Sequence, residues 1–250
     1  MAETITDELS RADEAFAGNR LLSTFSREAR ALLEPYGEMT ELESGEIVLT
    51  RGEAVHSSLF PVGPTMISMT VALSGGRSAE VASVGREGAV GGIVSCGHAP
   101  AFSRAEVLVP GPAFRLPMEA LEGAKSRSPF IGNLFCRFSD YLLAQVMQSV
   151  VCNSFHSIPE RAARWLLHAQ DRAGDRIELT QEAFAGLLGV QRTTVNAVVQ
   201  ELSSEGLIAT GRGRIHVTDR AGLKRRSCEC YERLEEHFGA VIGITGRGTP

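Results

Sequence analysis

Hydrophobic and polar positions follow three different patterns along the 250-residue chain. Residues 39–116 carry short runs, alternating or rich in β-branched residues, between turns that contain glycine or proline, and this is typical of short strands. Residues 128–157 have a helical period throughout, and residues 158–238 combine helical patterns with short strand-like runs. The predicted fold class is therefore α+β, with an N-terminal β-barrel of jelly-roll type, a long helix and a C-terminal helical domain.

The same patterns give the expected domain boundaries. Residues 1–38 form lead-in helices, residues 39–127 the barrel, residues 128–157 the long helix, residues 158–238 the C-terminal domain and residues 239–250 a flexible tail. Within the barrel the strand-like runs are 46–49, 59–62, 66–73, 79–84, 106–109 and 113–116. Turns separate these runs at regular spacing, which indicates a small barrel or jelly roll.

The spacing of small, apolar and polar residues between 179 and 207 fits a helix-turn-helix. Thr180 is placed to cap a first helix that starts at Gln181, because its hydroxyl can accept a free backbone N–H. Gly189 stands where the chain must turn and where a positive φ costs glycine little. A second helix, beginning near Gln191, buries an apolar face and leaves a polar face in water. That polar face could read a DNA groove.

A predicted hairpin follows the second helix. Two β-type runs, 207–210 and 215–218, flank a glycine turn, which is typical of the wing of a winged helix-turn-helix. Between residues 176 and 226 eight basic residues stand against five acidic ones, a net +3 in a chain of net charge −5. Arginines at a wing tip suit phosphates. The predicted DNA contacts are Thr180, Gln191, Arg192, Thr193, Thr194, Asn196, Gln200, Arg212 and Arg214.

Two apolar stripes run along the long helix. One has an alternating four-three spacing, and the other contains Phe135, Leu142, Val146 and Val150. A helix apolar on two sides needs two partners, and a single barrel can cover only one, so we expect a homodimer. The alternative is that both stripes are buried within one subunit. The expected dimer seam is the first stripe: Leu134, Phe138, Tyr141, Gln145, Gln148 and Cys152.

Composition limits the partners. The isoelectric point of 5.7 argues against a general nucleic-acid coat but allows one local basic face. No run of eighteen apolar residues occurs, and the chain starts with acidic residues rather than an export signal, so we expect a cytoplasmic protein without membrane contact. Five cysteines, an odd number, do not suggest a disulfide framework.

Candidate chemistry outside the DNA-binding region is weak in the sequence. Cys228 and Cys230 could chelate a metal or sense oxidants, but they lack a second pair at zinc-site spacing. We expect Cys136 and Cys152 to be small buried hydrophobic residues, with redox sensing by Cys152 across the dimer left open. The six histidines do not pair at ligand spacing. The sequence therefore predicts no metal site, no cofactor and no enzyme.

Two alternatives remain open at this point. The barrel could belong to a cupin-type enzyme, although such sites need a His-x-His pair and His56 stands alone. The winged helix could also bind protein rather than DNA.

A barrel, a long helix and a winged helix, in that order, resemble the Crp/Fnr family of bacterial transcription regulators. The stretches GREGAVGG at 85–92, SRAEV at 103–107, VVCNSFHSIPERAARWLL at 150–167 and RSCECY at 226–231 resemble a large branch of that family. The resemblance implies a cyclic-nucleotide-binding-like barrel, a homodimer on a palindromic operator, and RNA polymerase as a candidate further partner.

The sequence also departs from that family. Members that bind cyclic AMP resemble one another in a glycine-glutamate step and an arginine in an Arg-Ser-Ala run, which pairs the phosphate. This chain has Gly91 and Gly92 at the first place and Ser103 and Arg104 at the second, so the arginine is displaced by one residue and should turn to the opposite face of its strand. We keep these four residues as the candidate effector pocket, expect no tight cyclic-nucleotide binding and leave the small-molecule effector unassigned.

The recognition helix departs as well. Members that read a TGTGA-like half-site resemble Arg-Glu-Thr-Val-x-Arg, where the acid accepts from cytosine and the second arginine binds guanine. This chain keeps only the first arginine, Arg192. We expect Arg192 to contact guanine or phosphate, Thr193 and Asn196 to contact other base edges, and the operator to differ from that half-site.

Overall fold

The barrel is built from two antiparallel sheets. The computed structural model describes residues 13–75, 78–93 and 99–243. One sheet has the order β1(Glu38–Leu42), β7(Gly111–Pro117), β3(Ser57–Pro61), and the other has β2(Ile47–Leu49), β6(Arg104–Val109), β4(Met66–Ala72), β5(Ser78–Val84). All six expected strand runs are strands, and β1 is an addition.

Short helical segments precede the barrel. Residues 13–18 are helical, and η1(Leu22–Thr24), α2(Arg27–Arg30) and η2(Glu34–Tyr36) follow. Asn19 ties this segment to the barrel, because its Nδ2 donates to Pro61 O at 2.9 Å and to Gly88 O at 2.8 Å. The sequence pattern predicted lead-in helices here.

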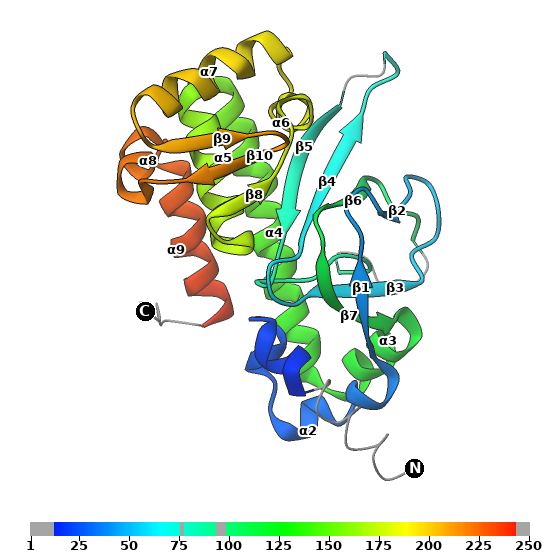
Figure 1. The fold of residues 1–250 in the computed structure, drawn as a ribbon. Coiled ribbons are helices and arrows are strands. Elements are labelled where there is room, and N and C mark those ends of the chain that lie inside the picture. The colour runs from blue at the N-terminus through cyan, green and yellow to red at the C-terminus, as the bar shows by residue number, and fades with distance from the viewer. Residues whose placement is uncertain (1–12, 76–77, 94–98, 244–250) are drawn as a thin grey trace.

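Two helices connect the barrel to the C-terminal domain. The chain passes from α3(Met118–Arg127) into α4(Pro129–Phe155), which runs past the barrel towards the C-terminal domain (Figure 1). Ser128 caps α4, since its Oγ accepts from Ile131 N at 3.4 Å, and Pro129 occupies the first turn, where no N–H is needed. Helix α4 is the long helix that the sequence predicted.

The stripe expected to form the dimer seam faces its own subunit. Phe138 is fully buried and its ring packs against Gly88 of the barrel. Tyr141 packs edge-on against Phe238 of α9(Cys230–Ile242), with ring centroids 4.9 Å apart. The seam prediction was wrong because α9 and the barrel together cover that side of α4. The residues that it named are all buried or half-buried: Leu134, Phe138, Tyr141, Gln145, Gln148 and Cys152.

The opposite side of α4 carries the exposed apolar side chains. They occupy helical spacing over the C-terminal half of the helix, with Val150 at 62% exposure and Phe155 at 80%. Val146 and Val150 of the second sequence stripe belong to this side, whereas Phe135 and Leu142 are buried. The exposed residues are Leu143, Val146, Met147, Val150, Val151 and Phe155.

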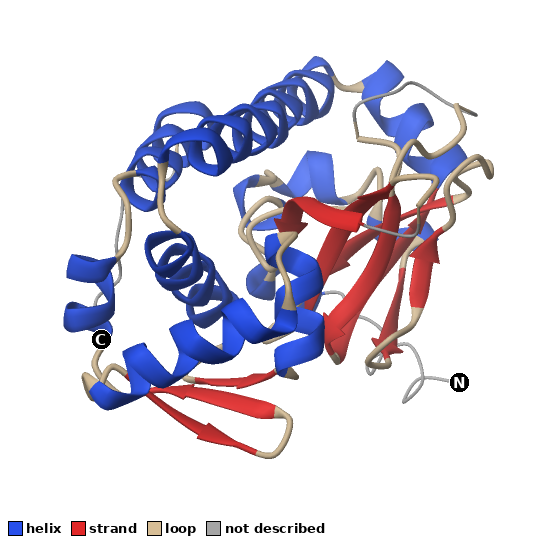
Figure 2. Ribbon diagram, turned by 90° about the horizontal axis from the view of Figure 1, so that it is seen from above, coloured by secondary structure: helices blue, strands red, loops and turns tan. Residues whose placement is uncertain are grey.

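The C-terminal domain contains a second core. Its elements are α5(Ile158–Ala173), β8(Arg176–Glu178), α6(Gln181–Leu188), α7(Arg192–Ser204), β9(Ile208–Gly211), β10(Arg214–Val217), α8(Arg220–Arg226) and α9. Figure 2 shows its three-stranded sheet, in the order β8, β10, β9, well apart from the barrel strands. Helix α9 extends to a buried Ile242, so residues 239–242 are helical rather than the start of a loose tail; residues 244–250 lie outside the described ones.

Two polar contacts join the barrel to α5. Glu80 on β5 accepts from Ser68 Oγ at 2.6 Å and from Trp165 Nε1 at 2.8 Å. Glu87 and Arg172 form an ion pair, with Arg172 Nη2 2.7 Å and Nε 2.8 Å from Glu87 Oε1, and both side chains are more than nine-tenths buried. Because buried charges are stable only when paired, these contacts fix where the C-terminal domain sits on the barrel.

Candidate nucleic-acid interface

Local sequence sets up the helix-turn-helix. Thr180 Oγ1 accepts from Ala183 N at 3.1 Å and so caps α6, as predicted. Gly189 ends α6 in the left-handed region with φ 67°, where a Cβ would add strain. Val195, at 0% exposure, and Leu202 anchor the inner side of α7 in the second core. The helix-turn-helix prediction is confirmed in position and in boundaries.

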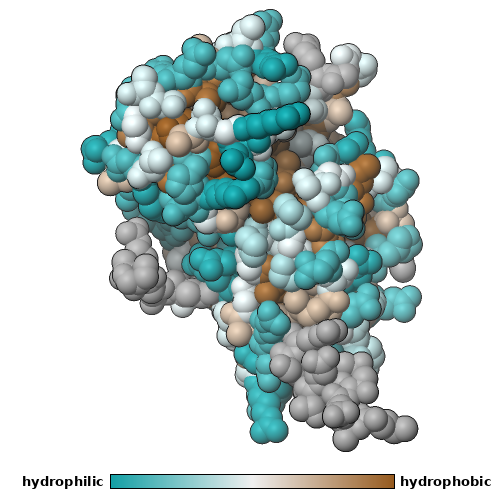
Figure 3. Space-filling model, viewed as in Figure 1, coloured by the Kyte–Doolittle hydropathy of each residue, from teal (hydrophilic) through white to brown (hydrophobic). Residues whose placement is uncertain are grey.

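The outer side of α7 faces solvent. Gln191, Arg192, Thr193 and Gln200 are exposed, and Thr194 and Asn196 are half-buried. Figure 3 shows that the surface over α7 and the adjoining hairpin is mostly hydrophilic. Within the described part of the chain, Asn196 Oδ1 is buried without a hydrogen-bond partner. An amide oxygen of this kind is available to a donor from outside the subunit.

Strands β9 and β10 form the predicted wing. They pair antiparallel from Arg214 opposite Gly211 to Val217 opposite Ile208, and β8 pairs with the other edge of β10. Gly213 turns the hairpin with φ 69°. Arg212 and Arg214 are both exposed, and Arg214 lies along Gly211. The wing therefore carries two cations beside the end of the recognition helix.

A groove connects the helix-turn-helix to the wing. It encloses about 380 Å³ and is lined in part by Thr180, Glu182, Arg192 and Arg214. Arg192 is 65% exposed at its side chain, and its Nη1 lies 3.7 Å from Glu182 Oε2. An ion pair this exposed and this long contributes little to stability. The Arg192 guanidinium is therefore free to exchange Glu182 for a phosphate or a base edge at low cost.

Other contacts hold α7 in place. Arg226 of α8 pairs with Glu201, and its Nε lies 3.1 Å from Glu205 Oε2 at the C-terminal end of α7. Arg161 Nη2 donates to Leu188 O at 2.7 Å, at the end of α6. Cations near helix C-termini also interact favourably with the helix dipole. Both contacts lie away from the exposed face of α7, so they position the interface without blocking it.

The candidate effector residues are packed or turned away from the barrel interior. A Cβ on Gly91 would meet Ser57 O, and one on Gly92 would meet the side chain of Met118. Arg104 is exposed at its side chain, and its Nη2 lies 2.6 Å from Glu106 Oε2, while Ala105 between them is fully buried. Ser103 is buried. The strand therefore directs Arg104 to the outside, as the one-residue displacement predicted.

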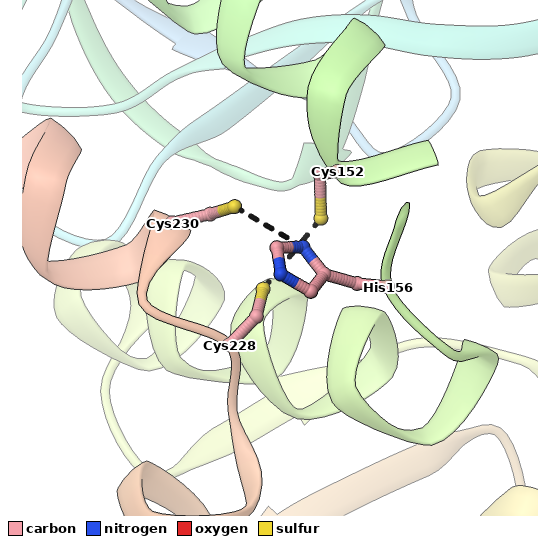
Figure 4. Close-up of side chains that lie close together, drawn as sticks. All are labelled: Cys152, His156, Cys228 and Cys230. Atoms are coloured by element: carbon pink, nitrogen blue, oxygen red, sulfur yellow. Dashed lines mark hydrogen bonds between the residues drawn. The ribbon is translucent and has the colours of Figure 1, made fainter. Parts of the chain in front are cut away.

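The structure also brings together a group of side chains that the sequence analysis did not combine. Cys152 and His156 end α4, and Cys228 and Cys230 lie at the start of α9, with their chelating atoms all within 4.8 Å of one another (Figure 4). Cys228 hydrogen bonds to Cys152, which lowers the pKa of the Cys152 thiol to about 5 and raises that of Cys228. The interpretation of Cys152 as an ordinary core residue was wrong, because its neighbours here are other thiols.

Fold and interface together define a class of protein: a transcription regulator with an N-terminal jelly-roll barrel and a C-terminal winged helix-turn-helix. Residues 160–226 match the Crp-like helix-turn-helix domain family. On that domain and on its fold, the chain belongs to the Crp/Fnr family. Among the described residues no helix combines the length and apolarity needed to cross a bilayer.

Similar proteins agree with this placement. The chain is 39% identical over 71 residues to the HTH-type transcriptional regulator Cmr of Mycobacterium tuberculosis (strain CDC 1551 / Oshkosh), a match that covers 28% of each protein. The fold is similar to FixK2 from Bradyrhizobium japonicum, with a TM-score of 0.65 and 16% identity over 77% of this chain and 98% of that one. A CRP-family transcriptional regulator from Thermus thermophilus gives 0.61 and 20% over 75% and 96%.

Proposed function

We propose that this chain is a cytoplasmic, homodimeric transcription regulator that binds a palindromic DNA operator through α7 and the wing. One observation carries the proposal: α7 is anchored by a buried apolar side, and its opposite, polar side stands free beside a wing with two exposed arginines. A recognition helix of about 10–12 Å diameter fits the major groove. The arginines are placed for phosphates, which carry no sequence information themselves.

The roles within the interface follow from chemistry. Arg192 can bind guanine or phosphate, and Asn196 has the amide that pairs with adenine. Thr193 and Gln200 add shorter or more flexible hydrogen-bonding groups on the same exposed face. The acid and the second arginine that read a TGTGA-like half-site are absent from the matching positions of α7, so the operator differs from that half-site.

The dimer uses the exposed side of α4. Its apolar residues, Leu143 to Phe155, continue for more than three helical turns on the side opposite the barrel and α9. Large apolar side chains arranged in one stripe are costly in water and suit a second copy of the same helix. A two-fold axis at this stripe would set two recognition helices on one face of the duplex, as a palindromic operator requires.

The barrel is a sensor-type domain without the groups that hold cyclic AMP. Arg104 points outwards and Met118 lies over Gly92, so a buried phosphate would find no cation at these positions. Calorimetry with cyclic AMP and cyclic GMP tests this statement, and micromolar or tighter affinity for either would contradict it. RNA polymerase remains a candidate partner of the DNA-bound dimer.

Operator selection from random or genomic duplexes, followed by mobility shifts at several salt concentrations, tests DNA binding. Arg192→Ala should weaken operator binding by about 1–3 kcal/mol, a loss of about five-fold to a hundred-fold or more. Arg127→Ala removes an exposed cation from α3 of the barrel and serves as the control, with wild-type affinity expected. Absence of any duplex binding would favour the protein-binding winged helix instead.

Sedimentation of Val150→Glu tests the dimer. A charge in the middle of the exposed stripe should give a monomer, because a glutamate buried at a two-fold interface faces its own copy. Val150→Leu keeps the surface apolar and should remain dimeric. A dimer of unchanged stability in Val150→Glu would place the interface elsewhere.

A further inference from the structure

Four chelating side chains meet where α4 ends and α9 begins. Cys152 Sγ lies 3.6 Å from Cys228 Sγ, and Cys230 Sγ lies 3.4 Å from His156 Nδ1. Figure 4 shows the three sulfur atoms around the imidazole, two residues coming from each side of the junction. Because Cys152 and His156 are four residues apart, they project from the same face of α4.

The distances agree with the edges of a zinc tetrahedron. Zinc–sulfur bonds of about 2.3 Å and zinc–nitrogen bonds of about 2.0 Å give sulfur–sulfur edges of about 3.8 Å and sulfur–nitrogen edges of about 3.5 Å. The two measured separations, 3.6 Å and 3.4 Å, are within a few tenths of an ångström of those edges. Little movement is needed for one ion to reach all four atoms.

Neighbouring groups already orient two of the four side chains. Glu229 Oε2 lies 3.2 Å from His156 Nε2, which directs Nδ1 towards the sulfur atoms. Metal-bound histidines typically donate their second ring N–H to a carboxylate in this way. Gln148 Nε2 donates to Cys230 Sγ at 2.9 Å, as expected for a sulfur that carries negative charge.

Burial also sets this group apart from an ordinary core. Cys152, Cys228 and Cys230 are 0%, 4% and 0% exposed, yet they belong to neither of the two apolar cores and cluster with one another. Cys136, on the same helix, is exposed and has no part in the group. Three buried thiols facing one imidazole are poor hydrophobic packing but a complete ligand set.

We infer that Cys152, His156, Cys228 and Cys230 form a closed, four-coordinate zinc site. Three thiols and one imidazole form a soft ligand set that favours zinc over magnesium or calcium. On binding, each cysteine S–H bond breaks and its proton passes to solvent, while His156 gives its Nδ1 lone pair, so three thiolates and one divalent ion leave a net charge of −1. With four protein ligands the ion keeps no open position, which makes the site structural rather than catalytic.

The place of the site gives it a mechanical role. It joins the C-terminal end of α4, which bears the proposed dimer stripe, to the segment after α8, and Arg226 of α8 holds the end of α7 through Glu201 and Glu205. A zinc ion would therefore fix the recognition helix relative to the dimer axis. This consequence depends on the proposed function, whereas the presence of the ion does not.

Metal analysis of the purified full-length chain tests the site. Protein prepared under reducing conditions should hold about one zinc ion per chain, and cobalt exchanged into the site should show the absorption of tetrahedral cobalt with thiolate charge transfer. Cys228→Ser and His156→Gln should lose most of the metal. Cys136→Ser removes a cysteine from the same helix outside the group and should keep it.

Other results would overturn the inference. They are a chain without zinc, iron in place of zinc, a Cys152–Cys228 disulfide without metal uptake, or equal metal loss in Cys136→Ser. If the ligand variants fail to fold, the cobalt titration of the wild-type chain still decides, and Glu229→Gln should weaken metal affinity by about 10- to 100-fold. Zinc without duplex binding would refute the proposed function alone, and duplex binding without zinc would refute only the metal site.

Discussion

The buried ion pair between Glu87 and Arg172 should govern how firmly the C-terminal domain is held on the barrel. Glu87 lies in the turn after β5 and also accepts from Gly85 N at 3.1 Å, while Arg172 donates to Ser83 O at 3.3 Å. Glu87→Gln removes one charge and leaves the Arg172 guanidinium buried, with a side chain only 5% exposed.

The expected cost follows from what remains after the change. Breaking a buried pair by removing one partner costs about 3–5 kcal/mol. The new amide oxygen can still accept from Gly85 N and Arg172 Nε, so we expect the lower end, about 3 kcal/mol. For a protein of this size that corresponds to a fall of about 6–12 °C in Tm.

Thermal unfolding of single and double variants tests this reasoning. Adding Arg172→Met to Glu87→Gln removes the unpaired charge, and the double variant should recover about half of the loss. Glu178→Gln breaks the exposed Arg176–Glu178 pair and should change stability by less than about 0.5 kcal/mol. The reasoning would be refuted if Glu87→Gln melted like wild type, or if the double variant were less stable than the single one.

Three further predictions concern the interface and the junction. Arg212→Ala and Arg214→Ala should each reduce the salt dependence of duplex binding by about one unit of slope and weaken all sequences alike, and a sequence-specific loss would contradict the wing assignment. Burial raises the pKa of Glu80, so the folded state favours its protonated form and loses that contribution as the pH rises through the raised pKa. Glu80→Gln should therefore melt above wild type at about pH 8 and like wild type at about pH 4, and equal melting at both would refute this. Gly189→Ala should cost about 1–2 kcal/mol through the positive φ alone, since Ala79 Cβ lies at an ordinary 3.5 Å from the added Cβ, and unchanged urea unfolding would contradict that strain.

Local signals explain what the sequence could predict. Thr180, Gly189 and the apolar spacing of α7 each specify structure within a few residues, so the helix-turn-helix and the wing were predictable with their boundaries. The outward turn of Arg104 was predictable because side chains alternate along a strand.

Long-range packing explains what it could not. Helix α4 is apolar on two sides, and only the tertiary position of α9 decides which side remains exposed; Tyr141 therefore faces Phe238 rather than a second copy. The Cys–His group joins positions 152 and 156 to positions 228 and 230, separated by more than seventy residues. The i, i+4 spacing of Cys152 and His156 was a signal, but only its meeting with the distant Cys-x-Cys pair gives it meaning.

Trp165 occupies an unusually informative place. It is the only tryptophan in the sequence, it is 4% exposed, and it packs against Phe184 of α6 while its indole donates across to β5. Separation of the C-terminal domain from the barrel would break that hydrogen bond and admit water to the ring. The native protein thus carries an intrinsic optical probe at its moving joint, and its emission can follow the joint in real time during titration with duplex or small molecules, without any attached dye.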